Sequence, residues 1–289
     1  MIATIAQLIL NGLMLGAIYA LAAVGLSLIF GIMGVVNLSH GSQLALAAFI
    51  TYMLYLFTSN IFVAGASAIL LVFLLGMVIE KVGVYPFRVS IPARLVVITF
   101  GIGKILEQII YMTWGPTYIT TPIYVPESLN ILGIAIGIYR VILLILSITM
   151  ILVLWIFIQK SRWGKAIRAI AQDEEAAAIY GVNIKWARTL TFALASALAA
   201  VAGIFLSSIY MFHSASGWEY LSIALSITIV GGLGDIRGAI IASFMLGIVE
   251  SYIGYFISPL WRTTVYFILI IIILTTKPSG LSGLWRSRT

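Results

Sequence analysis

The sequence predicts an all-α polytopic membrane protein built as a single domain, 1–289. Apolar residues make up 62% of the 289 positions and charged residues only 9%, whereas soluble domains carry about 25% charged residues. The apolar residues gather in runs near the roughly 20 residues that a helix needs to cross a bilayer. Glycine-rich, polar or charged segments separate these runs, as expected for membrane helices joined by loops.

Nine runs are candidate membrane-spanning helices, and a total of eight to ten fits the sequence. They cover 5–31, 41–57, 61–79, 95–114, 138–158, 189–212, 221–232, 239–256 and 263–276. The seventh and ninth runs are short, so we expect half-helices, re-entrant segments or helices that extend into their flanks. Small residues recur every four positions in the first and sixth runs, which predicts close helix packing within the chain or at a subunit seam. These residues are Gly12, Gly16 and Ala20, and Ala195, Ala199 and Gly203.

Positive charge is spread unevenly over the segments between the runs. Most Lys and Arg residues follow the third, fifth, seventh and ninth runs, whereas Arg140, at the start of the fifth run, and Arg262, just before the ninth, fall on the opposite side. The positive-inside rule therefore predicts a cell-membrane protein with its N-terminus outside and its C-terminus in the cytoplasm. The same bias explains the net charge of +7 better than nucleic-acid binding does. The segment after the fifth run contributes many of these cytoplasmic charges. The other basic residues on the predicted cytoplasmic side are Lys81, Arg88, Arg94, Arg237, Lys277, Arg286 and Arg288.

One predicted outside loop, 115–133, has an unusual composition. Pro116, Pro122 and Pro126 preclude a continuous helix. The loop has no Lys or Arg, and its β-branched and aromatic residues favour a short hairpin. We expect a structured cap that contacts an external partner, with an ordinary connector as the alternative.

Residues 160–188, here named the charged island, contain many of the chain's charged side chains between two long apolar runs. The segment 165–171 predicts a short amphipathic helix. Asp173 can cap a second helix, and Gly181 fits its C-terminus. Small alanines in the second helix allow it to lie close in a groove of another protein. We therefore expect a cytoplasmic docking segment rather than a solvated loop.

Two glycine-rich breaks interrupt the apolar runs, at 31–41 (the first break) and 231–238 (the second break). In the first break, Asn37 tolerates left-handed backbone and Ser39 can cap the following helix. The breaks are either plain turns or broken helices that face a translocation path. Their similar patterns suggest an internal duplication or a chance likeness of composition. The candidate path residues are Asn37, Ser39, His40, Gly41, Gly231, Gly232 and Gly234.

The sequence offers no catalytic, cofactor or metal site. It has no Cys and two distant His, and no nucleophile stands beside a base. The stretch 101–104 lacks the spacing of a phosphate-binding loop. Lys104 and Glu107 lie three residues apart in one apolar run, so we expect them to pair, with a transport role as the alternative. Glu250 is then the best candidate for the unpaired acid of an ion-coupled carrier.

Several segments together resemble a known family. The spacing of Glu175-Ala176-Ala177 to Gly181 resembles the EAA loop of ABC importer permeases, which docks onto a cytoplasmic ATPase. Over nearly the whole chain, the order of motifs is similar to branched-chain amino acid importer permeases, the smaller H-type membrane subunit of the Liv system. The matching segments are 12–41, 80–88, 161–169, 231–250 and 277–281.

This resemblance implies an ABC-importer permease fold and a membrane subunit that is not itself an enzyme and needs no cofactor. The implied partners are a second permease, two cytoplasmic ATPases, an extracytoplasmic solute-binding protein and membrane lipid. The implied substrate is a branched-chain, hydrophobic amino acid, with urea, amides or other small polar solutes as alternatives. An ion-coupled secondary carrier is the alternative from a different class. The implied ATPase-coupling residues are Gly164, Lys165, Arg168, Glu175, Ala176, Ala177 and Gly181.

Overall fold

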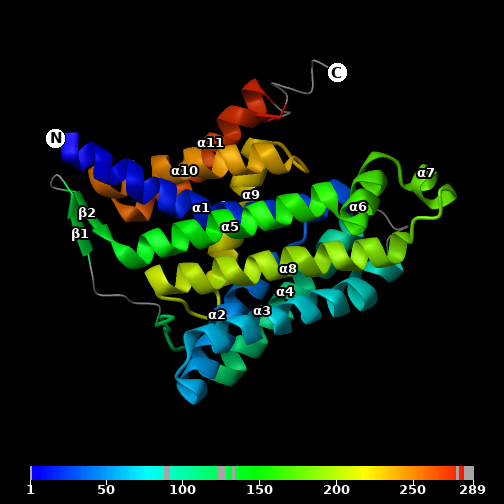
Figure 1. Ribbon diagram of the computed structural model, residues 1–289, viewed down its shortest axis with the longest axis horizontal. Helices are drawn as coiled ribbons and strands as arrows, with labels where there is room; N and C mark the ends of the chain where they lie inside the picture. The colour runs from blue at the N-terminus through cyan, green and yellow to red at the C-terminus, as the bar shows by residue number, and fades with distance from the viewer. Residues whose placement is uncertain (1, 88–91, 123–127, 132–133, 278–279, 283–289) are drawn as a thin grey trace.

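A computed structural model of the chain describes residues 2–87, 92–122, 128–131, 134–277 and 280–282. Most long helices run along one axis, and shorter helices cross them obliquely (Figure 1). The long elements are α1 (Ile2–Met33), α2 (His40–Thr58), α3 (Ile61–Val78), α4 (Pro92–Trp114), α5 (Ile138–Lys160), α8 (Ile184–Ile209), α9 (Ser216–Gly231), α10 (Ile236–Phe256) and α11 (Arg262–Thr276). The short ones are the π-helix η1 (Ile79–Val84), the 3-10 helices η2 (Tyr85–Phe87) and η3 (Pro259–Trp261), the strands β1 (Ser128–Ile131) and β2 (Ile134–Gly137), α6 (Arg162–Gln172) and α7 (Glu174–Ile179).

The helical membrane fold is confirmed, and its apolar helices follow the predicted order. Eight described helices are long and apolar enough to cross a membrane. Helix α9 is a ninth apolar helix, but its 16 residues extend only about 24 Å, which is shorter than a hydrocarbon core of about 30 Å. It begins at Ser216, upstream of the predicted run 221–232. The prediction missed this start because the first turn contains polar residues, which lower the local hydropathy.

The predicted hairpin exists but lies further along the chain than expected. Strands β1 and β2 pair antiparallel, with Ser128 opposite Gly137, so β2 falls beyond the predicted loop 115–133. The earlier part of that loop is tied to the chain after α8 instead: the backbone N–H groups of Ile119 and Phe212 each donate to the other's carbonyl at 2.8 Å. The hairpin lies at the end of the bundle where α1 begins (Figure 1).

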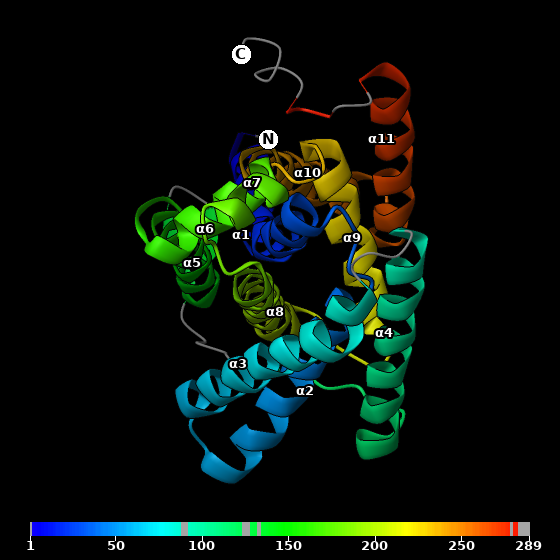
Figure 2. The same ribbon diagram turned by 90° about the vertical axis from the view of Figure 1, so that its right-hand side faces the viewer.

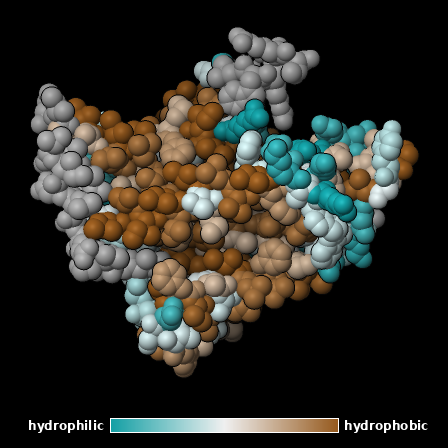
Figure 3. Space-filling view, in the orientation of Figure 1, coloured by the Kyte–Doolittle hydropathy of each residue, from teal (hydrophilic) through white to brown (hydrophobic). Residues whose placement is uncertain are grey.

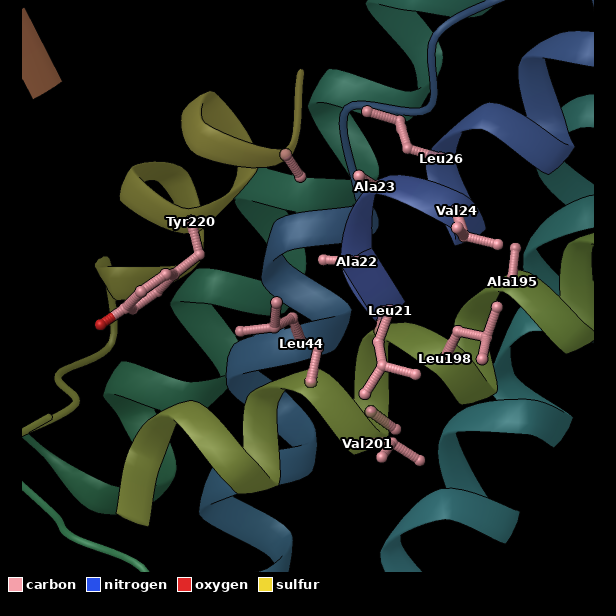
Figure 4. Close-up of a cluster of buried hydrophobic side chains, with 14 of the residues drawn as sticks. Leu21, Ala22, Ala23, Val24, Leu26, Leu44, Ala195, Leu198, Val201 and Tyr220 are labelled. Carbon is pink, nitrogen blue, oxygen red and sulfur yellow. The ribbon is translucent and has the colours of Figure 1, made fainter. Parts of the chain in front are cut away.

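Helix α1 lies in the middle of the bundle, with α5, α8, α9 and α10 around it (Figure 2). The predicted small-residue stripes pack helices within this chain. A Cβ built on Gly12 would lie 2.4 Å from Ile248 Cα of α10, and one on Gly203 would lie 2.0 Å from Leu44 O of α2. Apolar side chains of α1, α2, α8 and α9 complete the centre (Figure 4).

The two ends of the bundle differ in charge. Helices α6 and α7 project at one end, here named the island end, and hydrophilic residues gather there (Figures 1 and 3). Lys81 lies 5.8 Å from the ring of Trp186 at that end. Arg140 lies near the start of α1, where its guanidinium donates to Asn11 at 3.2 Å. The predicted loop residues Arg88, Pro126, Arg286 and Arg288 lie outside the described residues.

Candidate functional site

Helix α6 is amphipathic and held tightly to the end of α5. Its N-cap is Ser161, whose Oγ accepts from the Gly164 backbone N–H at 2.8 Å. A Cβ built on Gly164 would lie 2.3 Å from the carbonyl oxygen of Ile158, so only glycine permits this close turn. Ile167 and Ile170 are buried beneath the helix. The predicted amphipathic helix is therefore confirmed, and it extends beyond 165–171 at both ends.

Helix α7 has both of the predicted end signals. The carboxylate of Asp173 accepts from Ala176 N–H at 3.0 Å, which caps the first turn. At the other end Gly181 has a φ of 79°. Its N–H donates to Ala178 O and the Val182 N–H donates to Ala177 O, each at 3.0 Å. This bonding pattern is the Schellman motif, which satisfies the last carbonyls of a helix.

The predicted coupling residues divide into an outer and an inner set. Lys165, Glu175 and Gly181 are exposed, and Arg168 and Ala176 are half-buried. Gly164 and Ala177 are buried within this chain, so they shape the loop from the inside.

Sequence reasoning missed the two most prominent side chains of this surface, Ile179 and Tyr180. They are 84% and 87% exposed. The signal was present, because an apolar–aromatic pair directly precedes the helix-ending glycine in an otherwise charged segment.

A buried network anchors the charged island to the bundle. Arg188 of α8 pairs with Glu174 of α7 at 2.6 Å. The next residue, Thr189, donates to Glu80 of η1 at 2.5 Å. Glu80 is fully buried, and sequence reasoning did not single it out. The start of α8 is therefore joined both to the exposed α7 and to the end of the α3 segment.

The first break ends in a polar turn, 37–40, whose polar side chains are buried inside the chain. Asn37, Ser39 and His40 are each at most 1% exposed. Asn37 Oδ1 accepts from the Ser39 N–H at 3.1 Å and from the Ser39 hydroxyl at 2.7 Å. The prediction that Ser39 caps α2 with its side chain is wrong, because that hydroxyl bonds Asn37 and Gln43 instead. The left-handed position is Gly34, with a φ of 65°, rather than Asn37.

The second break is made of backbone. Gly232 and Gly234 have φ angles of 103° and 81°, which glycine adopts without steric cost. A Cβ built on Gly234 would lie 3.1 Å from Gly31 Cα at the end of α1. A later segment completes the turn, since the N–H groups of Leu281 and Ser282 donate to the Val230 and Gly231 carbonyls at 2.9 and 3.1 Å.

A cavity of about 830 Å³ lies between the charged island and the second break. Helices α1, α5, α6 and α10 line it, together with the turn 233–235. Arg168 and Arg237 are its basic residues. Of the candidate path residues, only Gly234 lines this cavity. Gly41 is packed against Gly217 of α9 instead, and Asn37, Ser39 and His40 lie in the polar turn.

Three ionisable residues of the long apolar helices have partners. Lys104 Nζ and Glu107 Oε2 lie 2.7 Å apart, so the predicted pairing is confirmed. Glu250 accepts hydrogen bonds from the hydroxyls of Tyr19, at 3.0 Å, and Tyr266. These hydroxyls hold the carboxylate in place within this chain. Within the part of the chain that the structure describes, no three His, Cys, Asp or Glu residues form a possible metal site.

A bundle of apolar helices with a capped two-helix loop at one end defines the chain as a polytopic membrane protein. The family described as branched-chain amino acid transport system / permease component matches residues 8–274. The chain therefore belongs to that family and is a permease component, which confirms the resemblance of its motifs.

Relatives over nearly the full length carry the same description. The chain is 30% identical over 96% of its length to the high-affinity branched-chain amino acid transport system permease protein LivH of Salmonella typhimurium, and covers 95% of that protein. The same three figures hold for LivH of Escherichia coli K12. BraD of Pseudomonas aeruginosa, which has the same descriptive name, is 26% identical over 96% of this chain and 95% of its own. No solved structure matches the chain significantly.

Proposed function

We propose that this chain is a membrane subunit of an ATP-driven importer of branched-chain amino acids. Its partners in this proposal are a second permease, two cytoplasmic ATPases and an extracytoplasmic solute-binding protein. Family membership and the names of the full-length relatives support the substrate class. Because the sequence lacks a phosphate-binding loop, we assign ATP hydrolysis to the partner subunits.

The observation that carries the coupling role is the exposed outer surface of the charged island. Ile179 and Tyr180 are largely exposed at the end of α7, beside the exposed Gly181 and Glu175. Large apolar side chains presented by a rigid, capped helix suit the helix-in-groove mode of protein recognition. We assign this surface to the ATPase. The island end is then cytoplasmic and the hairpin end faces outward, in agreement with the positive-inside rule.

Substrate uptake tests this proposal directly. The complete complex is reconstituted in vesicles with loaded binding protein, and uptake of labelled leucine is measured with and without ATP. We expect ATP-dependent leucine uptake that excess valine or isoleucine inhibits and excess urea does not. Uptake that follows an ion gradient without ATP, or labelled urea taken up in place of leucine, would contradict the proposal.

Substitution of Gly181 tests the coupling surface. Beyond its chain neighbours, Gly181 has no atom within 4 Å of a built Cβ, and Asp is one of the few side chains that enter left-handed backbone at small cost, so Gly181→Asp should fold. An unpaired charge buried at an interface costs several kcal/mol, so we expect roughly a hundredfold weaker ATPase binding. Gly181→Asn is the matched control, with the same shape and no charge, and should still co-purify with the ATPase. Full ATPase association and substrate-stimulated hydrolysis by Gly181→Asp would remove the coupling assignment.

A further inference from the structure

Lys104 and Glu107 of α4 form a small polar cluster with Trp218 of α9. Lys104 Nζ lies 2.7 Å from Glu107 Oε2 and 4.6 Å from the centre of the Trp218 ring. The indole N–H of Trp218 donates to the same carboxylate oxygen at 2.5 Å. Phe100 lies one turn earlier on α4, with its ring centre 5.2 Å from that of Trp218. The cluster therefore combines a cation, an anion and two aromatic faces.

The cluster lies near the middle of a membrane-spanning helix. At 1.5 Å per residue, Lys104 is roughly 15–18 Å from either end of α4. That distance is longer than the stem of a Lys side chain, so its ammonium cannot reach the headgroup region by extending along the helix. The pair is therefore held at a depth where a charged side chain costs about 2.5–3.5 kcal/mol on insertion scales.

The pair is nevertheless accessible from outside this chain. The side chain of Lys104 is 50% exposed and that of Glu107 is 20% exposed. The exposed Gln108 extends the polar stripe along the helix. Helices α4 and α11 form one edge of the molecule, opposite α5 (Figure 2). Because ionisable residues inside a membrane face protein or a water-filled cavity, this part of the α4 surface does not face lipid.

The same stretch of α4 packs against the first break. A Cβ built on Gly103 would lie 3.3 Å from Ser39 Cα. The backbone N–H of Leu38 donates to Thr99 Oγ1 at 3.2 Å. The polar turn thus supports α4 from behind while the Lys104–Glu107 pair faces away from it. Irregular backbone at membrane depth is tolerated where protein buries it or where it lines a cavity, and here it is buried.

We propose that Lys104 and Glu107 form a transient binding site for the charged groups of an α-amino acid on the translocation path. This inference rests on the proposed function, because it names the contact that such a substrate makes. The Lys104 ammonium offers hydrogen bonds to the substrate carboxylate, and the Glu107 carboxylate accepts from the substrate ammonium. In the empty state the two side chains neutralise each other. A zwitterion that inserts between them adds no net charge at membrane depth. Phe100 and Trp218 present apolar surface to an aliphatic side chain.

The chain has no cysteine, which permits a test by chemical restoration of the charge. In the assembled complex, Lys104→Cys should lower leucine uptake at least about tenfold. A thiosulfonate reagent that attaches an aminoethyl group restores an ammonium near the original position and should restore uptake, whereas a sulfonatoethyl reagent should not. Labelling of this chain is read by mass spectrometry.

Ile145→Cys on α5 is the matched control. Ile145 is 58% exposed on an apolar helix, faces lipid in this proposal, and should resist both charged reagents. Normal leucine uptake by Lys104→Cys, or labelling of Lys104→Cys as slow as that of Ile145→Cys, would overturn the inference. The proposed function would still stand if the wild-type complex takes up leucine. Absence of wild-type leucine uptake would instead overturn the proposed function and the ligand named here.

A second variant covers failure of Lys104→Cys to assemble. Glu107→Gln keeps the shape and can still accept from Trp218, so the complex should form, with a lower melting temperature because the Lys104 ammonium loses its counter-charge. We expect a severalfold lower maximal rate of leucine uptake, because the binding protein sets the apparent affinity and the path sets the rate. A full maximal rate in the assembled Glu107→Gln complex would overturn the inference.

Discussion

The two breaks resemble each other in sequence but are constructed in opposite ways. The first break is held by side chains: Asn37, Ser39 and Gln43 form a buried hydrogen-bonded chain. The second break is held by backbone, through left-handed glycines and through carbonyls that accept from a distant segment. The polar residues of the first break lie inside the bundle, whereas Gly31 at its start and the second break both border the cavity beside the charged island.

This difference shows that two glycine-rich segments of similar sequence can be stabilised by different kinds of interaction. A side-chain network inside a low-dielectric interior is costly to leave partly satisfied, so the first break is suited to one fixed arrangement. A turn of glycines between α9 and α10 has few side chains to repack, and it lies next to the loop assigned to the ATPase. The second break therefore depends on close backbone packing, such as that of Gly231 against Gly238, rather than on a side-chain network.

The largest expected effect comes from the closest contact of the first break. A Cβ built on Gly41 would lie 2.0 Å from Gly217 O and 2.6 Å from Leu221 Cβ. Gly41→Ala must separate α2 from α9, and overpacking of this kind should lower the free energy of unfolding by about 3 kcal/mol. Unfolding in mixed detergent micelles measures this change. Gly101→Ala is the control, because a Cβ there meets nothing within 4 Å, and it should not destabilise. Equal stabilities would mean that the first break tolerates rearrangement.

A smaller effect is expected when the side-chain network loses its acceptor. Asn37→Ala leaves the Ser39 N–H buried without its partner, which should cost about 2 kcal/mol. Asn60→Ala removes a comparable acceptor from the exposed N-cap of α3, so it should cost only about 1 kcal/mol. The same unfolding measurement applies to both. If the buried substitution proves cheaper than the exposed one, side chains do not hold the first break.

The smallest effect is expected at the second break. Asp235 caps α10 by accepting from the N–H groups of Arg237 and Gly238 at 2.9 and 3.2 Å. Asp235→Ala should cost about 1 kcal/mol, and Asp235→Ser, which keeps an acceptor, should cost less. Thermal unfolding of the purified permease distinguishes them. A loss at Asp235 larger than that at Asn37 would reverse the contrast between the two breaks.

The sequence predicts features whose causes are local. Hydropathy located the apolar helices, and the cap of Asp173 and the terminating Gly181 followed from residues within one or two turns. Features that depend on distant partners were not predictable in this way. The buried Glu80 is stabilised by a hydrogen bond from Thr189, 109 residues later in the chain. The Ser39 hydroxyl does not cap α2 because it bonds Asn37 and Gln43 instead. The path and coupling residues remain predictions.

The hydrogen bonds that complete the second break join residues that are far apart in the chain, and this bears on which break can form first during translation. Val230 and Gly231 accept from Leu281 and Ser282, which the ribosome adds about fifty residues later. The hydrogen bonds of Asn37, Ser39 and Gln43 need no residue of α10 or α11, so this polar turn can close while those helices are still emerging. Until the later segment arrives, two carbonyls at the end of α9 rely on water or on the insertion machinery. The polar turn of the first break can therefore form before the second break is complete.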